Sequence, residues 1–260
     1  MPVSTTNQGE NLLQRKQDLE LLMSCLDLTS LNDTDNEETI DRLCQTATSS
    51  PVHPASVCIY PRFVKQAKLF FKDTKIKVCT VVNFPSGSLH PSYVTKEVKD
   101  AVEDGADEID VVFNYDAINC GCTSAYGVAP VSAADKVLQD YEDVVLKVIL
   151  ETAALKGRDA IQRACRLSLA AGADFVKTST GKHAAGGATL EAADAMLECI
   201  RECGGCYGLK VSGGIRTVDD AFSYLNLVRQ KMWSGYASPQ HFRIGASVLL
   251  DVLKKEYSTL

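Results

Sequence analysis

The sequence is poor in the features that mark several large classes of protein. It has four histidines, one tryptophan and a net charge of -6 in 260 residues. This acidic balance argues against nucleic acid or an anionic membrane as the main partner. No apolar run approaches the ~20 residues of a membrane span, and the polar residues 1–10 do not resemble a secretory signal. We therefore expect a soluble, cytoplasmic protein with a small-molecule partner, although Ser258-Thr259-Leu260 weakly resembles a peroxisomal address.

Metal-ligand patterns are also scarce, because none of the four histidines stands at ligand spacing to another. The ten cysteines include a C-x-C pair at Cys120 and Cys122 and a late group at Cys199, Cys203 and Cys206. Most of the others lie in apolar patterns, which favours reduced thiols that pack as small hydrophobic residues. Zinc ligation or disulfides are the alternative. We expect neither a metal nor a cofactor.

Short apolar runs alternate along the chain with helical patterns. Nearly continuous apolar runs are typical of parallel strands that are buried on both faces. The eight expected strands are Leu21–Leu28, Ser56–Tyr60, Lys77–Val82, Glu108–Phe113, Val144–Leu150, Phe175–Thr178, Tyr207–Val211 and Phe242–Gly245.

Helical spacing of apolar residues fills most of the gaps between these runs. The expected helices are residues 33–48, 92–104, 159–171, 190–202 and 218–230, with Asp33, Ser92, Asp159 and Thr217 as N-caps, and an extra helix at about residues 9–20. Eight such units predict a single (β/α)8 TIM-barrel domain over residues 1–260, with a polar tail at 1–10. A doubly wound open sheet is the competitor, but no early G-x-G-x-x-G supports it. Residues 119–132, rich in Gly, Ser and Cys, are expected to form an irregular loop near the mouth.

Active sites of such barrels lie where the strands end, so residues near those ends are the candidates. Lys177 stands inside the apolar run Phe175-Val176-Lys177, where an unpartnered ammonium is costly. It is either a salt-bridged structural lysine or an amine that becomes neutral and attacks a carbonyl.

Two further charged residues stand in equivalent apolar runs. Lys210 ends the next strand, and a second cation at the same level would favour a neutral Lys177. Asp110 is an isolated acid within its strand, and is either a structural partner for a lysine or the carboxylate of a proton relay. We expect the neighbouring Asp107 and Glu108 to be exposed.

Glycine turns after three consecutive strands predict an anion site. Each turn precedes a helix, and the glycines let backbone N–H groups approach a phosphate closely. The turns are Thr180-Gly181-Lys182, Gly213-Gly214 and Gly245-Ala246-Ser247. The strand ends add Asp27, Thr29 and Cys58 as candidate substrate contacts.

Several runs taken together resemble the deoxyribose-phosphate aldolase family, in order, from about residue 20 to about residue 255. They are Leu26–Thr29, Cys58–Pro61, Val82–Pro85, Asp107–Val112, Leu146–Thr152, Lys177–Gly181, Ser212–Thr217 and Arg243–Ser247.

The resemblance implies a class I aldolase that cleaves 2-deoxy-D-ribose 5-phosphate reversibly to acetaldehyde and D-glyceraldehyde 3-phosphate, in deoxyribonucleoside catabolism. By position, Lys177 matches the Schiff-base lysine, Lys210 the lysine that perturbs it, and Asp110 the relay carboxylate. Asp27 matches an acid that places the sugar hydroxyls. The glycines at 181, 213, 214 and 245, with Ser247, match the phosphate cradle. Val248 departs from relatives that have a second serine there. Relatives also suggest a homodimer.

Three alternatives remain. A lysine-dependent barrel aldolase with another donor would share the nucleophile. A phosphosugar isomerase would use an acid and a base, with Lys177 only as an ion-pair partner. A catalytically silent sugar-phosphate sensor has no need of a neutral lysine, so the combination of Asp110, Lys177 and Lys210 argues against it.

Overall fold

The strands close into a parallel barrel in chain order, from β1 to β8, with β8 pairing back onto β1. This computed structural model describes residues 5–122 and 124–260. The strands are β1 Leu26–Thr29, β2 Ser56–Ile59, β3 Lys77–Val82, β4 Glu108–Val112, β5 Val145–Ile149, β6 Phe175–Lys177, β7 Gly208–Ser212 and β8 Phe242–Ala246. The predicted TIM barrel is therefore confirmed.

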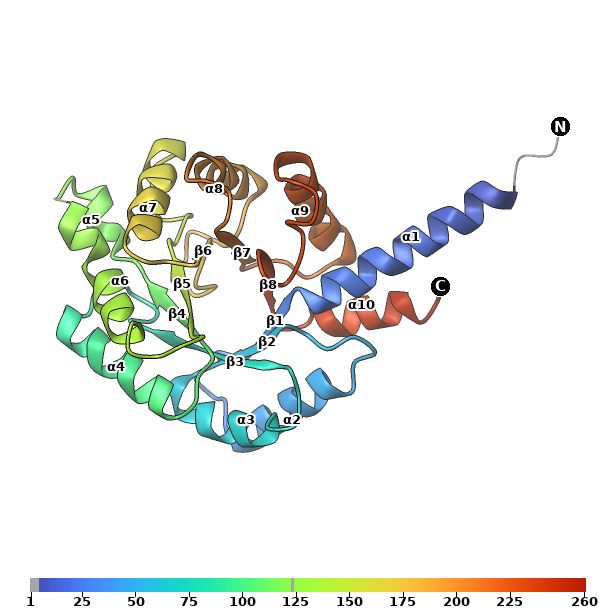
Figure 1. The fold of residues 1–260 in the computed structure, drawn as a ribbon, viewed down its shortest axis with the longest axis horizontal. Coiled ribbons are helices and arrows are strands. Elements are labelled where there is room, and N and C mark those ends of the chain that lie inside the picture. Colours follow the sequence, from blue (N-terminus) through green and yellow to red (C-terminus); the bar gives the residue numbers. More distant parts are fainter. Residues whose placement is uncertain (1–4, 123) are drawn as a thin grey trace.

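Helices surround the barrel, and α1 extends beyond that ring beside α10 (Figure 1). They are α1 Thr5–Ser24, α2 Glu37–Thr48, α3 Val64–Phe70, α4 Pro91–Glu103, α5 Tyr115–Asn119, α6 Ser124–Leu138, α7 Arg158–Ala170, α8 Leu190–Glu202, α9 Val218–Lys231 and α10 Leu249–Tyr257, with a 3-10 turn η1 at Pro61–Phe63. None of the described helices combines the length and apolar character needed to cross a membrane.

Apolar packing falls into two clusters of very different size. The large one joins the outward-facing strand residues, such as Val57, Ile109 and Leu209, to the helices. The small one contains Leu31, Cys58, Cys79 and Val81. Barrel interiors are usually filled by layers of Val, Ile and Leu. Here Lys147 and Lys210 are among the largest fully buried side chains, so much of the interior is given to charge.

The first helix is longer than predicted. It runs from Thr5 to Ser24, so it includes residues 5–10 of the expected polar tail and the beginning of the expected first strand. Residues 1–4 of that tail lie outside the described part of the chain. The run from Leu21 to Leu28 was misleading because Leu22 and Met23 are buried helix residues, and an apolar run alone does not separate a buried helix from a strand.

The predicted helices 190–202 and 218–230 begin where α8 and α9 begin, but only one of the four predicted N-caps is correct. Thr217 caps α9 through a capping box with Asp220, as expected. Three other caps are wrong, because Asn36, His90 and Gly157 take the positions assigned to Asp33, Ser92 and Asp159.

The expected irregular loop at residues 119–132 is also wrong. Helix α5 ends at Asn119 and α6 begins at Ser124, and α6 packs against α4, β4 and β5. Its content of Gly, Ser and Cys made this segment look like a loop. Yet a Cβ at Gly127 would lie 2.7 Å from the ring of Phe113, so this glycine allows close packing. Pro130 lies buried inside the helix.

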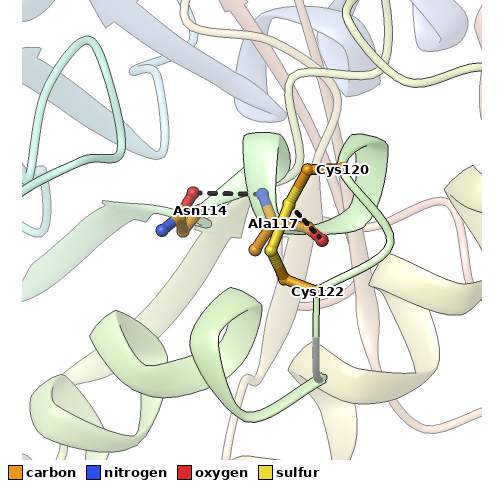
Figure 2. Close-up of a disulfide and its surroundings, with 4 residues drawn as sticks. All are labelled: Asn114, Ala117, Cys120 and Cys122. Atoms are coloured by element: carbon orange, nitrogen blue, oxygen red, sulfur yellow. Dashed lines mark hydrogen bonds between the residues drawn. A yellow bond between two sulfur atoms is a disulfide. The ribbon is translucent and has the colours of Figure 1, made fainter.

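Figure 2 shows that Cys120 and Cys122, at the end of α5, form a disulfide. The expectation of reduced thiols throughout is therefore wrong for this pair. The other eight cysteines are free, and six of them are buried. Asn114, the N-cap of α5, accepts a hydrogen bond from the amide of Ala117 beside the disulfide.

Candidate active site

Strands β4, β6 and β7 bring the predicted charged residues together inside the barrel. Lys177 and Lys210 are direct register partners on β6 and β7, and Asp110 is paired with Lys147 across β4 and β5. Side chains alternate between the two faces of a strand, so the apolar residues beside each of these groups point outward to the helices. That alternation leaves the charged groups inside the barrel.

Asp110 is the centre of the cluster. One of its carboxylate oxygens, Oδ2, accepts hydrogen bonds from Nζ of Lys177 and from Nζ of Lys210, each at 2.8 Å. Asp110 and Lys210 are fully buried, and Lys177 is 3% exposed. The geometry therefore joins the three residues that the sequence singled out.

A third lysine, Lys147, belongs to the same cluster and had been given no role from the sequence. Its Nζ lies 2.9 Å from the other oxygen of Asp110 and 2.7 Å from Glu108. The signal was the same as for Lys177, a single lysine inside an apolar strand. Lys147 lacked the glycine turn that drew attention to Lys177 and Lys210.

Below this level, Arg243 of β8 bridges Asp27 and Glu108 at 2.6 and 2.8 Å. Glu108 is only 1% exposed, so the expectation of an exposed residue is wrong. It lies two positions before Asp110 and therefore points to the same side of β4, into the barrel. Asp27 also forms an ion pair with Lys210, with 2.5 Å between Oδ2 and Nζ. The interior thus combines the carboxylates of Asp27, Glu108 and Asp110 with three lysines and one arginine.

Burial and charge act in opposite directions on the pKa values of these groups. Burial alone raises the pKa of Asp110, but Lys147, Lys177 and Lys210 together hold it well below its usual value. Burial alone lowers the pKa of Lys210, but Asp110 and Asp27 outweigh it and raise that pKa above its usual value. Lys210 therefore stays protonated and places a second positive charge beside Lys177.

A cavity of about 260 Å³ lies at the carboxyl ends of the strands, and Lys177 contributes to its lining. Eight predicted substrate contacts line it, namely Thr29, Thr180, Gly181, Lys182, Gly213, Gly214, Gly245 and Ser247. The lining also includes Asn32, Ser212 and Arg216, which had been given no role. Arg216 could have been suspected, since it follows the glycine pair and its guanidinium suits an anion.

Backbone geometry explains the glycines of this cavity. Gly181, Gly213 and Gly214 have φ angles of 76°, 88° and 86°, a region that favours glycine. Gly245 has a different reason, because a Cβ there would lie 3.3 Å from Cε of Lys210 and 3.0 Å from Cβ of Ser212. It leaves room for the buried lysine.

Two predicted substrate contacts, Asp27 and Cys58, do not line the cavity. Both are fully buried, and Asp27 binds Lys210 and Arg243. A hydrogen bond with Cys79 lowers the pKa of the Cys58 thiol to about 7, against the effect of burial.

Among the residues that the structure describes, two groups of acids and thiols come close enough to bind a metal ion: Cys58 with Cys79 and Asp110, and Asp27 with Cys79 and Glu108. Lys147 already donates to Cys79 and Asp110, at 3.1 and 2.9 Å. Because ammonium groups occupy these acceptors, the donor set suits lysine better than a metal ion.

A parallel barrel with a buried lysine beside a carboxylate and a second lysine, below a glycine-rich cavity, is the arrangement of a Schiff-base-forming aldolase. The comparisons with known proteins agree. Residues 21–255 match the DeoC/LacD family of aldolases, so this chain belongs to that family.

Relatives in this family cover nearly the whole chain. The deoxyribose-phosphate aldolase of Agrobacterium fabrum (strain C58 / ATCC 33970) is 47% identical over 241 residues, which are 92% of each chain. A candidate deoxyribose-phosphate aldolase from Toxoplasma gondii ME49 has a TM-score of 0.85 at 26% identity, over 95% of this chain and 96% of its own. The tetrameric deoxyribose phosphate aldolase of Aeropyrum pernix has a TM-score of 0.77 at 26% identity, over 96% and 99%.

Proposed function

We propose that this aldolase cleaves 2-deoxy-D-ribose 5-phosphate reversibly to acetaldehyde and D-glyceraldehyde 3-phosphate through a Schiff base on Lys177. The observation that carries the proposal is the position of Lys177, which lines the cavity and also contacts Asp110 of the buried cluster. The 47% identity to the Agrobacterium fabrum enzyme supports the choice of substrate.

The proposed chemistry begins at the amine of Lys177, which attacks the C1 aldehyde of the open sugar. Loss of water gives an iminium ion, and the C2–C3 bond then breaks with its electron pair moving toward the iminium nitrogen. The proton of the C3 hydroxyl passes to a relay that includes Asp110, Lys210 and water. Glyceraldehyde 3-phosphate leaves, C2 of the enamine takes a proton, and hydrolysis frees acetaldehyde and Lys177.

The cavity supports a phosphorylated substrate. Glycine turns after β6, β7 and β8 face it, and Lys182 and Arg216 add cations to its lining. In this proposal the backbone N–H groups of Gly181, Gly213 and Gly214 bind phosphate oxygens.

The same substrate suggests a role in deoxyribonucleoside catabolism in the cytoplasm. We propose a homodimer without a nucleic-acid or membrane partner. The tetrameric relative supports self-association, and sedimentation would measure it.

Borohydride trapping tests the covalent step. Reduction in the presence of acetaldehyde or 2-deoxyribose 5-phosphate should fix a two-carbon or sugar fragment on Lys177, located by peptide mass mapping. Lys177→Met should lose the label, whereas Lys182→Met, which changes another lysine of the cavity, should keep it on Lys177. Label only at other lysines, or an active enzyme without label, contradicts the Schiff base. A screen of donor aldehydes separates this proposal from an aldolase with another donor.

A further inference from the structure

Glu151 is a buried carboxylate to which the mechanism above gives no role. It lies two residues after the end of β5 and is fully buried. Its φ angle is 52°, in the left-handed region that glycine favours and that other residues occupy at a cost. One of its oxygens, Oε1, has no hydrogen-bond partner among the described residues. Two costly features therefore meet in one residue beside the active site.

The other oxygen of Glu151 holds the first glycine turn of the cavity. Oε2 accepts from the backbone N–H of Thr180 at 3.1 Å and from the Thr180 hydroxyl at 2.5 Å. The hydroxyl oxygen of Thr180 in turn accepts from the backbone N–H of Lys182 at 3.0 Å. The carboxylate thus holds Thr180 directly, and Thr180 holds the amide of Lys182 at the other end of the turn.

The backbone around Glu151 explains how it reaches across to the next strand. The amides of Leu150 and Thr152, on either side of it, donate to the carbonyls of Lys177 and Thr178 at 2.9 and 2.8 Å. The segment after β5 therefore remains attached to the end of β6. With the left-handed turn at Glu151, its side chain meets Thr180 just beyond Lys177.

These contacts also change the role of Thr180 in the cavity. Both its amide and its hydroxyl donate to Glu151, so neither is free to donate to an anion. Gly181 is the residue that the turn presents, with a φ angle of 76° and no atom within 4 Å of the point where a Cβ would lie. The carboxylate thus holds the turn through Thr180, while Gly181 faces open space.

We propose that Glu151 is a positioning residue, which orders the turn Thr180–Lys182 so that it can bind the phosphate of the substrate. This inference rests on the proposed function, since it assigns the turn to phosphate. Hydrogen bonds to an ionised acceptor are stronger than those between neutral groups, which suits a carboxylate to this task.

Simple electrostatics leads to the opposite expectation, and this makes the proposal testable. A negative charge near a phosphate site repels the ligand, so neutralising Glu151 should tighten binding if charge alone matters. If Glu151 acts by ordering the turn, removing its acceptor oxygens should weaken binding instead. Charge repulsion and ordering of the turn therefore predict opposite changes in phosphate affinity.

The experiment measures the dissociation constant of inorganic phosphate by calorimetry, and KM and kcat for 2-deoxyribose 5-phosphate and unphosphorylated 2-deoxyribose. The variants are Glu151→Ala, Glu151→Gln and Thr180→Val. Glu142→Ala is the matched control, because Glu142 is an exposed glutamate before the same strand.

In Glu151→Ala the dissociation constant of phosphate and KM for the phosphorylated sugar should rise roughly 10- to 100-fold, the usual effect of losing hydrogen bonds to a charged group. The kinetics with unphosphorylated 2-deoxyribose should change little. Glu151→Gln keeps one neutral acceptor and should restore part of the affinity. Thr180→Val should weaken phosphate binding, and with Glu151→Ala its effect should be less than additive.

Tighter phosphate binding in Glu151→Gln, or an equal loss with both sugars, overturns the proposal. If Glu151→Ala does not fold, Glu151→Gln and Thr180→Val give the same comparison. The phosphate titration needs no turnover, so it decides the role of Glu151 even if the wild-type enzyme prefers another phosphorylated aldehyde. Absence of phosphate binding in the wild type also overturns it.

Discussion

Lys177 and Lys210 are register partners on adjacent strands, and their ammonium groups donate to the same oxygen of Asp110 at 2.8 Å each. A single oxygen that serves both lysines couples their charges. When Lys177 becomes an imine, Lys147 and Lys210 remain as the ammonium groups that compensate Asp110. Lys210 can therefore act as a fixed charge and as a member of the proton relay.

Replacing Lys210 separates these two effects. Lys210→Leu should move the pH profile of imine formation upward, because Lys177 would hold its proton more tightly beside an Asp110 that keeps only Lys147 as another cation. The maximum rate should fall by about 10²-fold or more, as for loss of a general acid–base group. Lys210→Arg should restore the pH profile better than the rate, since it keeps the charge but misplaces it. Trapping or stopped flow over a pH series measures both, and an unmoved midpoint in Lys210→Leu would show that Lys210 does not tune Lys177.

The buried cluster should also govern how stability depends on pH. The pKa of Asp110 is lowered, so its contribution is present above the unfolded value of about 3.9 and is lost as the pH falls below it. The pKa values of Lys147 and Lys210 are raised, so their contribution is present below about 10.4 and is lost only at higher pH. The cluster should therefore stabilise the fold across neutral pH.

Asp110→Asn reverses this behaviour. Three ammonium groups would lose their shared carboxylate, which should cost about 3–5 kcal/mol at pH 6, as for other broken buried pairs. A buried lysine without its partner favours the neutral form, so the variant should regain stability as the pH rises toward 9. Urea unfolding at pH 6 and pH 9 measures both effects. Equal changes with pH in variant and wild type would argue against charge as the cause.

Chelation tests the assignment of the acid and thiol groups. Ligand atoms of Cys58, Cys79 and Asp110 lie within 4.8 Å of one another, a spacing that a metal ion could use. Lys147 contacts two of these groups, so activity should survive dialysis against a strong chelator. Loss of activity that zinc restores would show that a metal displaces this ammonium group in the working enzyme.

The sequence predicted the barrel from apolar runs that alternate with helical patterns, and it predicted the three central charged residues from their isolation inside such runs. A charged residue inside an apolar strand stands out, and it is tolerated only where other charges meet it. Lys147 meets the same criterion and could have been identified in the same way. Glu108 and Arg243 were harder, because charged residues near the start of a strand look like ordinary exposed ones until the register is known.

Glu151 and helix α6 were missed for another reason. The role of Glu151 depends on a left-handed backbone angle and a contact with Thr180, 29 residues further along the chain. Gly127 and Pro130 usually end helices, and only packing against Phe113 explains the glycine inside α6. Both depend on tertiary contacts rather than on local pattern.

A pair of glycine variants separates backbone strain from steric fit in the proposed phosphate cavity. Gly181 and Gly213 both have positive φ angles, so alanine should cost about 1 kcal/mol of stability at either site. At Gly181 a Cβ meets nothing within 4 Å, whereas at Gly213 it would lie 2.9 Å from Cα of Gly187. Because that neighbour is backbone, it cannot move aside as a side chain could. Gly213→Ala should therefore lose more stability in urea unfolding than Gly181→Ala, and more phosphate affinity by calorimetry. If the two variants behave alike, the close approach of Gly213 and Gly187 does not shape the cavity.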